Sequence, residues 1–243
     1  MPYIIHPLTL ARLEIDRSLM TYRMHIGEKM WIPVTTWYIK GSDKNILVDT
    51  GGSCNIASKY FSGSCKDVIS FEDALSRYNL APEKIDIVIL THLMWDHCAN
   101  MRKCVNAKVI VQEEELRFAY APHPILAHSY GKEFLQDIRF IIVRGDTKVM
   151  NGIEVLFTPG HSPGCQSVAI ETSKGKAIIA GFCCIMDNFR PPPEVKERFP
   201  VIPLGIALNP AQAFDSALRI KGLADILLPL HDPDIAQMGK IPS

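Results

Sequence analysis

The sequence of 243 residues predicts a single α/β domain, residues 1–243, built from two sheets with helices on the outside. Short apolar runs alternate with segments of helical periodicity, and most of these runs end at polar or glycine-rich turns. No segment has the composition of a flexible interdomain linker. With 47 % hydrophobic and 21 % charged residues, the chain has the composition of a globular protein, which excludes collagen, coiled coil and low-complexity disorder.

The first half of the sequence predicts strands and two helices. The strands are rich in β-branched and aromatic residues and are expected at residues 35–39, 45–48, 85–90 and 108–111. One helix is expected from the N-cap Ser70 through Tyr78, because apolar residues recur there at helical spacing. A second helix is expected over residues 112–120.

The second half repeats this alternation. Further strands are expected at residues 138–143, 153–157, 167–171, 177–180 and 225–230. Asn209 followed by Pro210 predicts the start of a helix, because asparagine caps a helix and proline fits its first position. We expect this helix to run to about Lys221.

Charge, hydropathy and cysteine usage exclude several classes of partner. The 26 basic residues are balanced by 26 acidic ones, so no basic surplus attracts nucleic acid. No apolar run approaches the roughly 20 residues of a membrane span, and the N-terminus lacks the features of a secretory signal. The seven cysteines are odd in number and include no C-x-x-C pair, so we expect reduced, mostly buried thiols in a cytoplasmic protein.

Aspartate and histidine recur where predicted strands end, at Asp49, at the segment His92–His97, at His161 and at His231. Ligand sites of α/β proteins form beyond the carboxyl ends of strands, so these four loops are expected to converge. The segment His92–His97 alone holds two imidazoles and a carboxylate. Such ligands suit zinc, iron or manganese better than calcium.

With these residues, the sequence resembles the metallo-β-lactamase superfamily, and within it the N-acyl-homoserine lactonase-like branch. The segments that carry the superfamily resemblance follow the family's order, and they are Val48–Gly51, His92–His97, Thr158–Gly164 and Leu230–Asp232. Two stretches point to the lactonase-like branch, namely Trp95–Cys98 and Leu227–Pro233. The resemblance implies an αβ/βα four-layer sandwich, the metallo-β-lactamase fold, with metals bound at one edge of the two sheets.

Three positions depart from the family pattern. In the motif H-x-H-x-D-H, Met94 stands where the second histidine belongs. Phe182 follows Gly181 where the family has an aspartate that bridges two metals. Ile185 occupies the position of the lactonases' tyrosine, three residues further on.

These substitutions affect the two implied metal sites unequally. By resemblance, the first metal would use His92, His161 and the positions of Met94 and Phe182, so two of its four ligands are lost. The second would use Asp96, His97 and His231 with the missing bridge, and keeps three of four. Three protein ligands and an open position are typical of catalytic zinc, so we expect one zinc per chain rather than two, with iron or manganese as alternatives.

The remaining assignments concern residues around that metal. By resemblance, Asp49 orders the metal loop through hydrogen bonds. Asp96 and His161 are expected to be catalytic, with His161 or His92 as general base or oxyanion stabiliser.

Several cysteines and methionines permit two interpretations. Either Cys183 or Cys184 replaces the missing carboxylate, or both are core cysteines. Because adjacent strand residues point to opposite faces, at most one of them would face the site. Four large apolar residues either line an adaptable pocket over the site or pack in the core, namely Met20, Met24, Met30 and Trp31.

These patterns predict a metal-dependent hydrolase of a small cyclic ester or amide, and hence a small-molecule substrate and no nucleic-acid or membrane partner. The oligomeric state stays open, a homodimer included. The alternative is a catalytically degenerate member that binds a small ligand in the same place, and a third interpretation is that one or both substitutions are engineered. Because the lactonases' bridging carboxylate and tyrosine are absent, homoserine-lactone hydrolysis is expected to be slow or absent.

Overall fold

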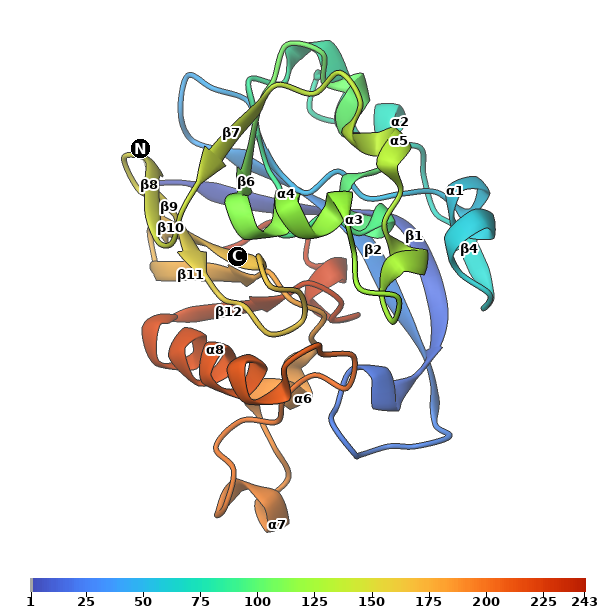
Figure 1. Ribbon diagram of the computed structural model, residues 1–243. Helices are drawn as coiled ribbons and strands as arrows, with labels where there is room; N and C mark the ends of the chain where they lie inside the picture. Colours follow the sequence, from blue (N-terminus) through green and yellow to red (C-terminus); the bar gives the residue numbers. More distant parts are fainter. Residues whose placement is uncertain (1) are drawn as a thin grey trace.

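The computed structural model describes residues 2–243 and contains two β-sheets flanked by helices (Figure 1). The seven-stranded sheet has the order β4-β1-β2-β3-β5-β6-β7 and the five-stranded sheet the order β12-β11-β10-β9-β8. The first sheet comprises β1 Ile4–Asp16, β2 Lys29–Lys40, β3 Ile46–Val48, β4 Cys65–Asp67, β5 Ile87–Ile89, β6 Lys108–Gln112 and β7 Phe140–Val143. The second comprises β8 Thr147–Met150, β9 Ile153–Phe157, β10 Gln166–Thr172, β11 Gly175–Ala180 and β12 Ile226–Pro229.

Alternating side chains divide the core into layers. In β3, Ile46 and Val48 belong to a buried cluster shared by both sheets, whereas Leu47 belongs to a second cluster that includes residues of the helices. In β11, Ile179 joins the first cluster and Ile178 the second. One face of each sheet therefore packs against the other sheet and the opposite face against helices, which confirms the four-layer αβ/βα sandwich.

The longest helix, α8 (Pro210–Leu223), lies beside the five-stranded sheet along β12 (Figure 1). The side chain of Asn209 caps its first turn by accepting from the Gln212 amide at 3.2 Å, as the sequence predicts. The shorter helices are α1 Cys54–Tyr60, α2 Phe71–Ser76, α3 Trp95–Cys98, α4 Glu113–Tyr120, α5 Lys132–Leu135, α6 Met186–Phe189 and α7 Pro193–Lys196. Single 3₁₀ turns occur at Arg17–Leu19, Pro82–Lys84, Met101–Lys103, Ala127–Ser129 and Ile235–Gln237.

The predicted elements are present, although β2 begins six residues before the predicted strand at 35–39, and the sequence does not predict β1, β4, β8 or several short helices. Strand β1, of 13 residues, pairs with β2 in antiparallel register, which shifts between Thr9 and Ala11. Leu8, before the shift, and Leu13 and Ile15, after it, are buried in the same cluster beside the helices. The irregularity moves the residues that face this cluster from even to odd positions, so the strand shows no continuous period of two.

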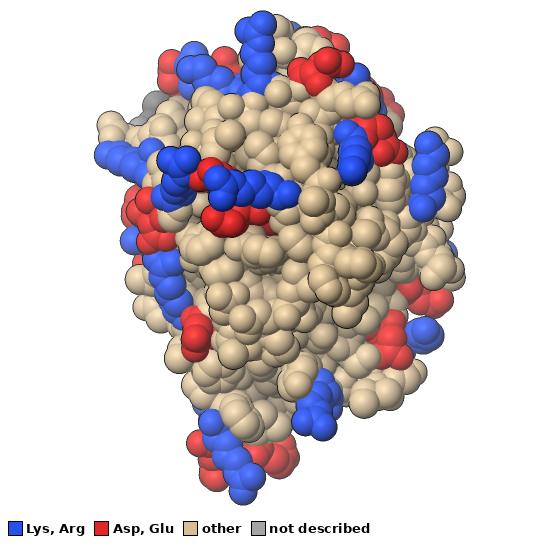
Figure 2. All heavy atoms as spheres, in the orientation of Figure 1, with Lys and Arg blue, Asp and Glu red and all other residues tan. Residues whose placement is uncertain are grey.

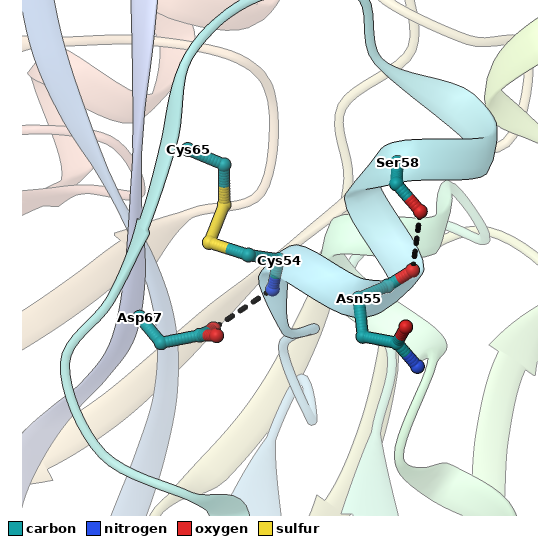
Figure 3. The surroundings of a disulfide bond; sticks show 5 residues. All are labelled: Cys54, Asn55, Ser58, Cys65 and Asp67. Atoms are coloured by element: carbon teal, nitrogen blue, oxygen red, sulfur yellow. Dashed lines mark hydrogen bonds between the residues drawn. A yellow bond between two sulfur atoms is a disulfide. The ribbon is translucent and has the colours of Figure 1, made fainter.

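The cysteine prediction is wrong for two of the seven residues. Cys54 at the start of α1 and Cys65 in β4 form a disulfide, beside a hydrogen bond of 2.8 Å from the Cys54 amide to Asp67 (Figure 3). The other five cysteines are buried free thiols, as expected. The disulfide thus joins α1 to β4, and cysteine spacing alone does not reveal this proximity. The disulfide also removes one of the arguments for a cytoplasmic location.

The surface shown in Figure 2 carries basic and acidic side chains interspersed around its rim, with a broad area free of charged residues in the centre. No large patch of a single sign forms on this face. Among the helices of residues 2–243, none has the length and apolar character needed to cross a bilayer.

Candidate metal centre

Asp49 is the buried residue on which the candidate site is built. It follows β3 and has a φ of 56°, in the left-handed region that aspartate tolerates better than most residues. This conformation accompanies three hydrogen bonds of 2.8 Å to its carboxylate, from the Thr91 amide, the Thr91 hydroxyl and His97 Nδ1. Asp49 therefore fixes the loop after β5 and the ring of His97 together.

Each of the four site histidines has its Nδ1 engaged by an oxygen atom. His97 bonds to Asp49, His231 to the Pro33 carbonyl at 2.9 Å, and His161 to the Ile206 carbonyl at 2.6 Å. His92 Nδ1 lies 3.0 Å from the Thr91 hydroxyl, which itself donates to Asp49. Such partners place the ring proton on Nδ1 and leave Nε2 as the nitrogen that takes a metal or a proton.

Asp96, His97 and His231 form a group in which one ligand atom from each lies within 4.8 Å of the others. Asp96 Oδ2 is 3.2 Å from His97 Nε2 and 3.9 Å from His231 Nε2. Two donors that each bind one zinc at about 2.0–2.2 Å lie at most about 4.4 Å apart, so both of these pairs fit one ion. His97 Nε2 is buried without a hydrogen bond of good geometry among the described residues, which is the situation of a nitrogen awaiting a ligand.

His92 and His161 lie next to this trio. The ring centroid of His92 is 3.9 Å from that of His97 and 4.9 Å from that of His161. His92 Nε2 is also buried and has no hydrogen-bond partner among residues 2–243. All five residues therefore converge as the sequence predicts, and the side chain of Asp96, 15 % exposed, is the most accessible of those in the ion pairs.

The pKa values of these groups differ because of their charged neighbours. Burial lowers the pKa of His161 to about 4, and burial likewise lowers the pKa of His92 and His231. Burial would lower the pKa of His97 too, but Asp96 and Asp49 together raise it to about 10. His97 and His231 in turn overcome the burial of Asp96 and lower its pKa. Asp96 is thus held as a carboxylate, the form that binds a metal.

The substituted positions lie in the apolar core. Met94, Phe182 and Ile185 are all buried and belong to one hydrophobic cluster. The Phe182 ring lies 6.2 Å from that of Phe189, and it follows Gly181, where any Cβ would lie 1.6 Å from the Gln166 carbonyl oxygen. Apolar packing thus surrounds the side of the site where the family pattern has a carboxylate.

Cys183 and Cys184 lie after the end of β11, outside any strand, so strand alternation does not govern where they point. Cys183 Sγ is 3.8 Å from the sulfur of Met20, and Cys184 Sγ is 3.8 Å from the Ala180 carbonyl oxygen. Burial raises the pKa of both thiols, which disfavours the thiolate that a metal would need. These contacts favour the interpretation that Cys183 and Cys184 are core cysteines and that Met20 packs in the core.

The sequence analysis assigns no role to two further residues of this region, Thr91 and Glu115. Thr91 links His92 to Asp49 through its hydroxyl, and its position directly before the first motif histidine is the one available clue. Glu115 is fully buried although it ends a run of three glutamates that suggests a solvated helix start. Its spacing of four residues from the buried Ala119 places it on the inner face of α4.

The comparisons agree with this geometry. Residues 30–181 match the family model described as "Metallo-beta-lactamase superfamily". An N-acyl homoserine lactonase of Bacillus cereus is 31 % identical over 181 residues, which span 70 % of each chain. A metallo-beta-lactamase domain-containing protein 1 of Xenopus laevis is 27 % identical and covers 77 % of this chain and 66 % of its own.

Solved structures extend the similarity over nearly the whole chain. An N-acyl homoserine lactone hydrolase with the product N-hexanoyl-L-homoserine bound at its catalytic metal centre superposes with a TM-score of 0.79 and 25 % identity, covering 96 % of this chain and 95 % of the other. A probable metal-dependent hydrolase from Staphylococcus aureus shares the fold with a TM-score of 0.73 at 21 % identity, covering 94 % and 89 %. The chain belongs to the metallo-β-lactamase superfamily.

Proposed function

We propose that this protein is a metal-dependent hydrolase that opens a small cyclic ester with one ion held by Asp96, His97 and His231. The observation that carries the proposal is the cluster of these three ligand atoms, in which His97 Nε2 is buried beside Asp96 without a hydrogen bond of good geometry among the described residues. The relatives that hydrolyse N-acyl homoserine lactones make a lactone the first substrate class to test.

A bound metal ion of this kind supplies a nucleophilic water at neutral pH and polarises the substrate carbonyl. Without an ion, Asp96 and His97 hold opposite charges; Asp96 Oδ2 and the deprotonated His97 Nε2 would be the atoms that hold an ion. Asp49 and the Pro33 carbonyl keep the rings of His97 and His231 oriented throughout.

His161 is the proposed proton acceptor. Its Nδ1 is bound to the Ile206 carbonyl, and its lowered pKa keeps Nε2 free of a proton at neutral pH. Nε2 is therefore able to take a proton from the attacking water and return it to the alkoxide that leaves when the ring opens. His92 Nε2, equally unprotonated and buried, lies beside it.

The test combines metal content with turnover. Elemental analysis of the purified protein is expected to give about one ion per chain, the composition of a three-ligand catalytic site. Acid release from N-acyl homoserine lactones of short and long acyl chains should be measurable but slower by about 10²–10³ than in two-metal lactonases, the usual cost of losing an oxyanion donor. Chelation should abolish it. Two tightly held ions per chain, or unimpaired turnover, contradict the proposal.

The second candidate is a degenerate member that binds a small ligand without turnover. The observation that favours it is the apolar packing of Met94 and Phe182 beside the site. Calorimetry with the same lactones separates the two functions, because saturable binding without acid release supports the second and excludes the first.

A further inference from the structure

Glu115 is a buried acidic residue that the proposed function does not use. It lies in α4 with no exposed surface. A carboxylate in such a place destabilises a fold unless hydrogen bonds replace its lost hydration. Its partners therefore indicate what it does.

The carboxylate of Glu115 accepts hydrogen bonds on both oxygens. Oε1 accepts from the Leu93 amide and from the Tyr130 hydroxyl, each at 2.9 Å, and Oε2 accepts from the Ser162 hydroxyl. Every partner is a donor, and a carboxylate is an acceptor on both oxygens whereas a carboxamide is not. Burial raises the pKa of this carboxyl, and the hydrogen bonds from Ser162, Leu93 and Tyr130 oppose that shift.

Two of these partners are direct neighbours of site histidines. Leu93 follows His92 in the loop after β5, and Ser162 follows His161 in the loop after β9. One carboxylate thus ties a loop of the seven-stranded sheet to a loop of the five-stranded sheet. The two histidine rings that it flanks lie 4.9 Å apart.

The second loop also packs against the backbone of Glu115. A Cβ at Gly164 would lie 2.0 Å from the Glu115 nitrogen and 2.3 Å from its Cα. Such closeness requires glycine, because a Cβ at this position would clash with the first turn of α4. The carboxylate is therefore fixed in position relative to both histidines.

We propose that Glu115 is a positioning residue that holds His92 and His161 together at the reaction centre. The metal trio has separate supports, because His97 rests on Asp49 and His231 on the Pro33 carbonyl. The proposal rests on the proposed function for the role of His161 as proton acceptor. It explains why two imidazoles remain ordered although Met94 and Phe182 replace their former co-ligands.

The test uses Glu115→Gln and Ser162→Ala, with Tyr130→Phe as matched control. Tyr130→Phe removes a donor from the same carboxylate but leaves both histidine loops tied. Rates of diethyl pyrocarbonate modification of each histidine are followed by peptide mass spectrometry. Losing a hydrogen bond to a charged group should raise the modification rates of His92 and His161 about tenfold or more in Glu115→Gln, raise that of His161 alone in Ser162→Ala, and leave both within about twofold in the control.

His97 and His231 serve as the internal reference, measured on chelated protein whose fold is verified by circular dichroism. If all four histidines become reactive together, Glu115 has a merely structural role and the proposal fails. It also fails if His92 and His161 stay protected in both variants. Should Glu115→Gln not fold, Ser162→Ala alone still decides.

Turnover separates this inference from the proposed function. In an active protein, Glu115→Gln and Ser162→Ala should lower kcat with little change in KM or metal content. If the parent does not hydrolyse lactones, the proposed function is wrong, while the modification rates still test the positioning role. If the parent is active and both variants keep full kcat, the proposed function stands and the positioning role is overturned.

Discussion

The two halves of the histidine cluster differ in what they have kept. The half of Asp96, His97 and His231 keeps its ligand atoms and the oxygens that orient them. The half of His92 and His161 has oriented imidazoles, but apolar residues stand at the two positions where the family resemblance places further ligands. The hydrogen bonds that orient a histidine are therefore present even where apolar residues replace the ligands expected beside it. One half is suited to hold an ion and the other to act on protons near it.

The largest difference between the halves should appear when one histidine is removed from each. His97→Ala deletes a ligand and leaves Asp96 and Asp49 without their common partner, so the metal content should fall to near zero. His92→Ala deletes an imidazole from the other half and should leave the content unchanged. Elemental analysis after gel filtration measures both, with the exposed His123→Ala as control. Loss of the ion in both variants would mean that the halves share one site.

Restoring the missing ligands tests the same comparison in the opposite direction. Met94→His together with Phe182→Asp should add a second ion per chain. Each change alone should add little, because one ligand without the other leaves an incomplete site, and an unpaired buried carboxylate is costly. Metal content and Tm of the single and double variants measure this coupling.

The contrary outcome is also informative. Phe182 is 1 % exposed, so its replacement leaves a gap in the apolar cluster that it shares with Phe189. A double variant that loses stability and gains no metal would show that the core has closed over the former position. The alignment of Phe182 with the bridging aspartate would then be wrong.

Within the metal-holding half, Asp49→Asn should weaken affinity without removing the ion. Asparagine accepts the left-handed conformation of this position, so the backbone at φ 56° is not disturbed. One of the two charges that raise the pKa of His97 is lost while that of Asp96 stays, and metal affinity should fall about 10–100-fold, as is usual for partners of metal-bound histidines. Competition with a chromogenic chelator measures it. An unchanged affinity would show that Thr91 and the backbone suffice to orient the ring.

The sequence predicts those features of the molecule that depend on local residue spacing. Asp49, the segment from His92 to His97, His161 and His231 each stand at a strand end, and the carboxyl ends of the strands bring them together. It does not predict β1, because an irregularity at Thr9 interrupts the period of two along the strand.

Contacts that depend on tertiary packing could not be predicted from the sequence either. The pairing of Cys54 with Cys65 depends on α1 lying beside β4, and the burial of Glu115 depends on how α4 packs against the loop at Gly164. Neither follows from residue type, since cysteines in odd number and glutamates in a run are typical of free thiols and of solvated surfaces.

The smallest effect on the site is expected from the disulfide. Reduction frees α1 from β4, and the loss of a bridge that closes so short a loop should lower the free energy of unfolding by about 3 kcal/mol. In a chain of this length, each kcal/mol shifts Tm by about 2–4 °C. Dithiothreitol should therefore lower Tm by roughly 6–12 °C.

Metal content should nevertheless stay constant on reduction, although α1 ends in Tyr60, whose ring stacks on that of Trp95 at 6.4 Å, next in sequence to the proposed ligand Asp96. Trp95 is buried, and a Cβ at Gly52 would lie 2.9 Å from its ring, so the backbone packs against it independently of α1. Cys54→Ser/Cys65→Ser supplies the control, since its Tm should start low and no longer respond to dithiothreitol. Release of the ion on reduction would instead show that strain in α1 passes through Tyr60 and Trp95 to Asp96, and the metal-holding half would then depend on the oxidation state of a bond outside it.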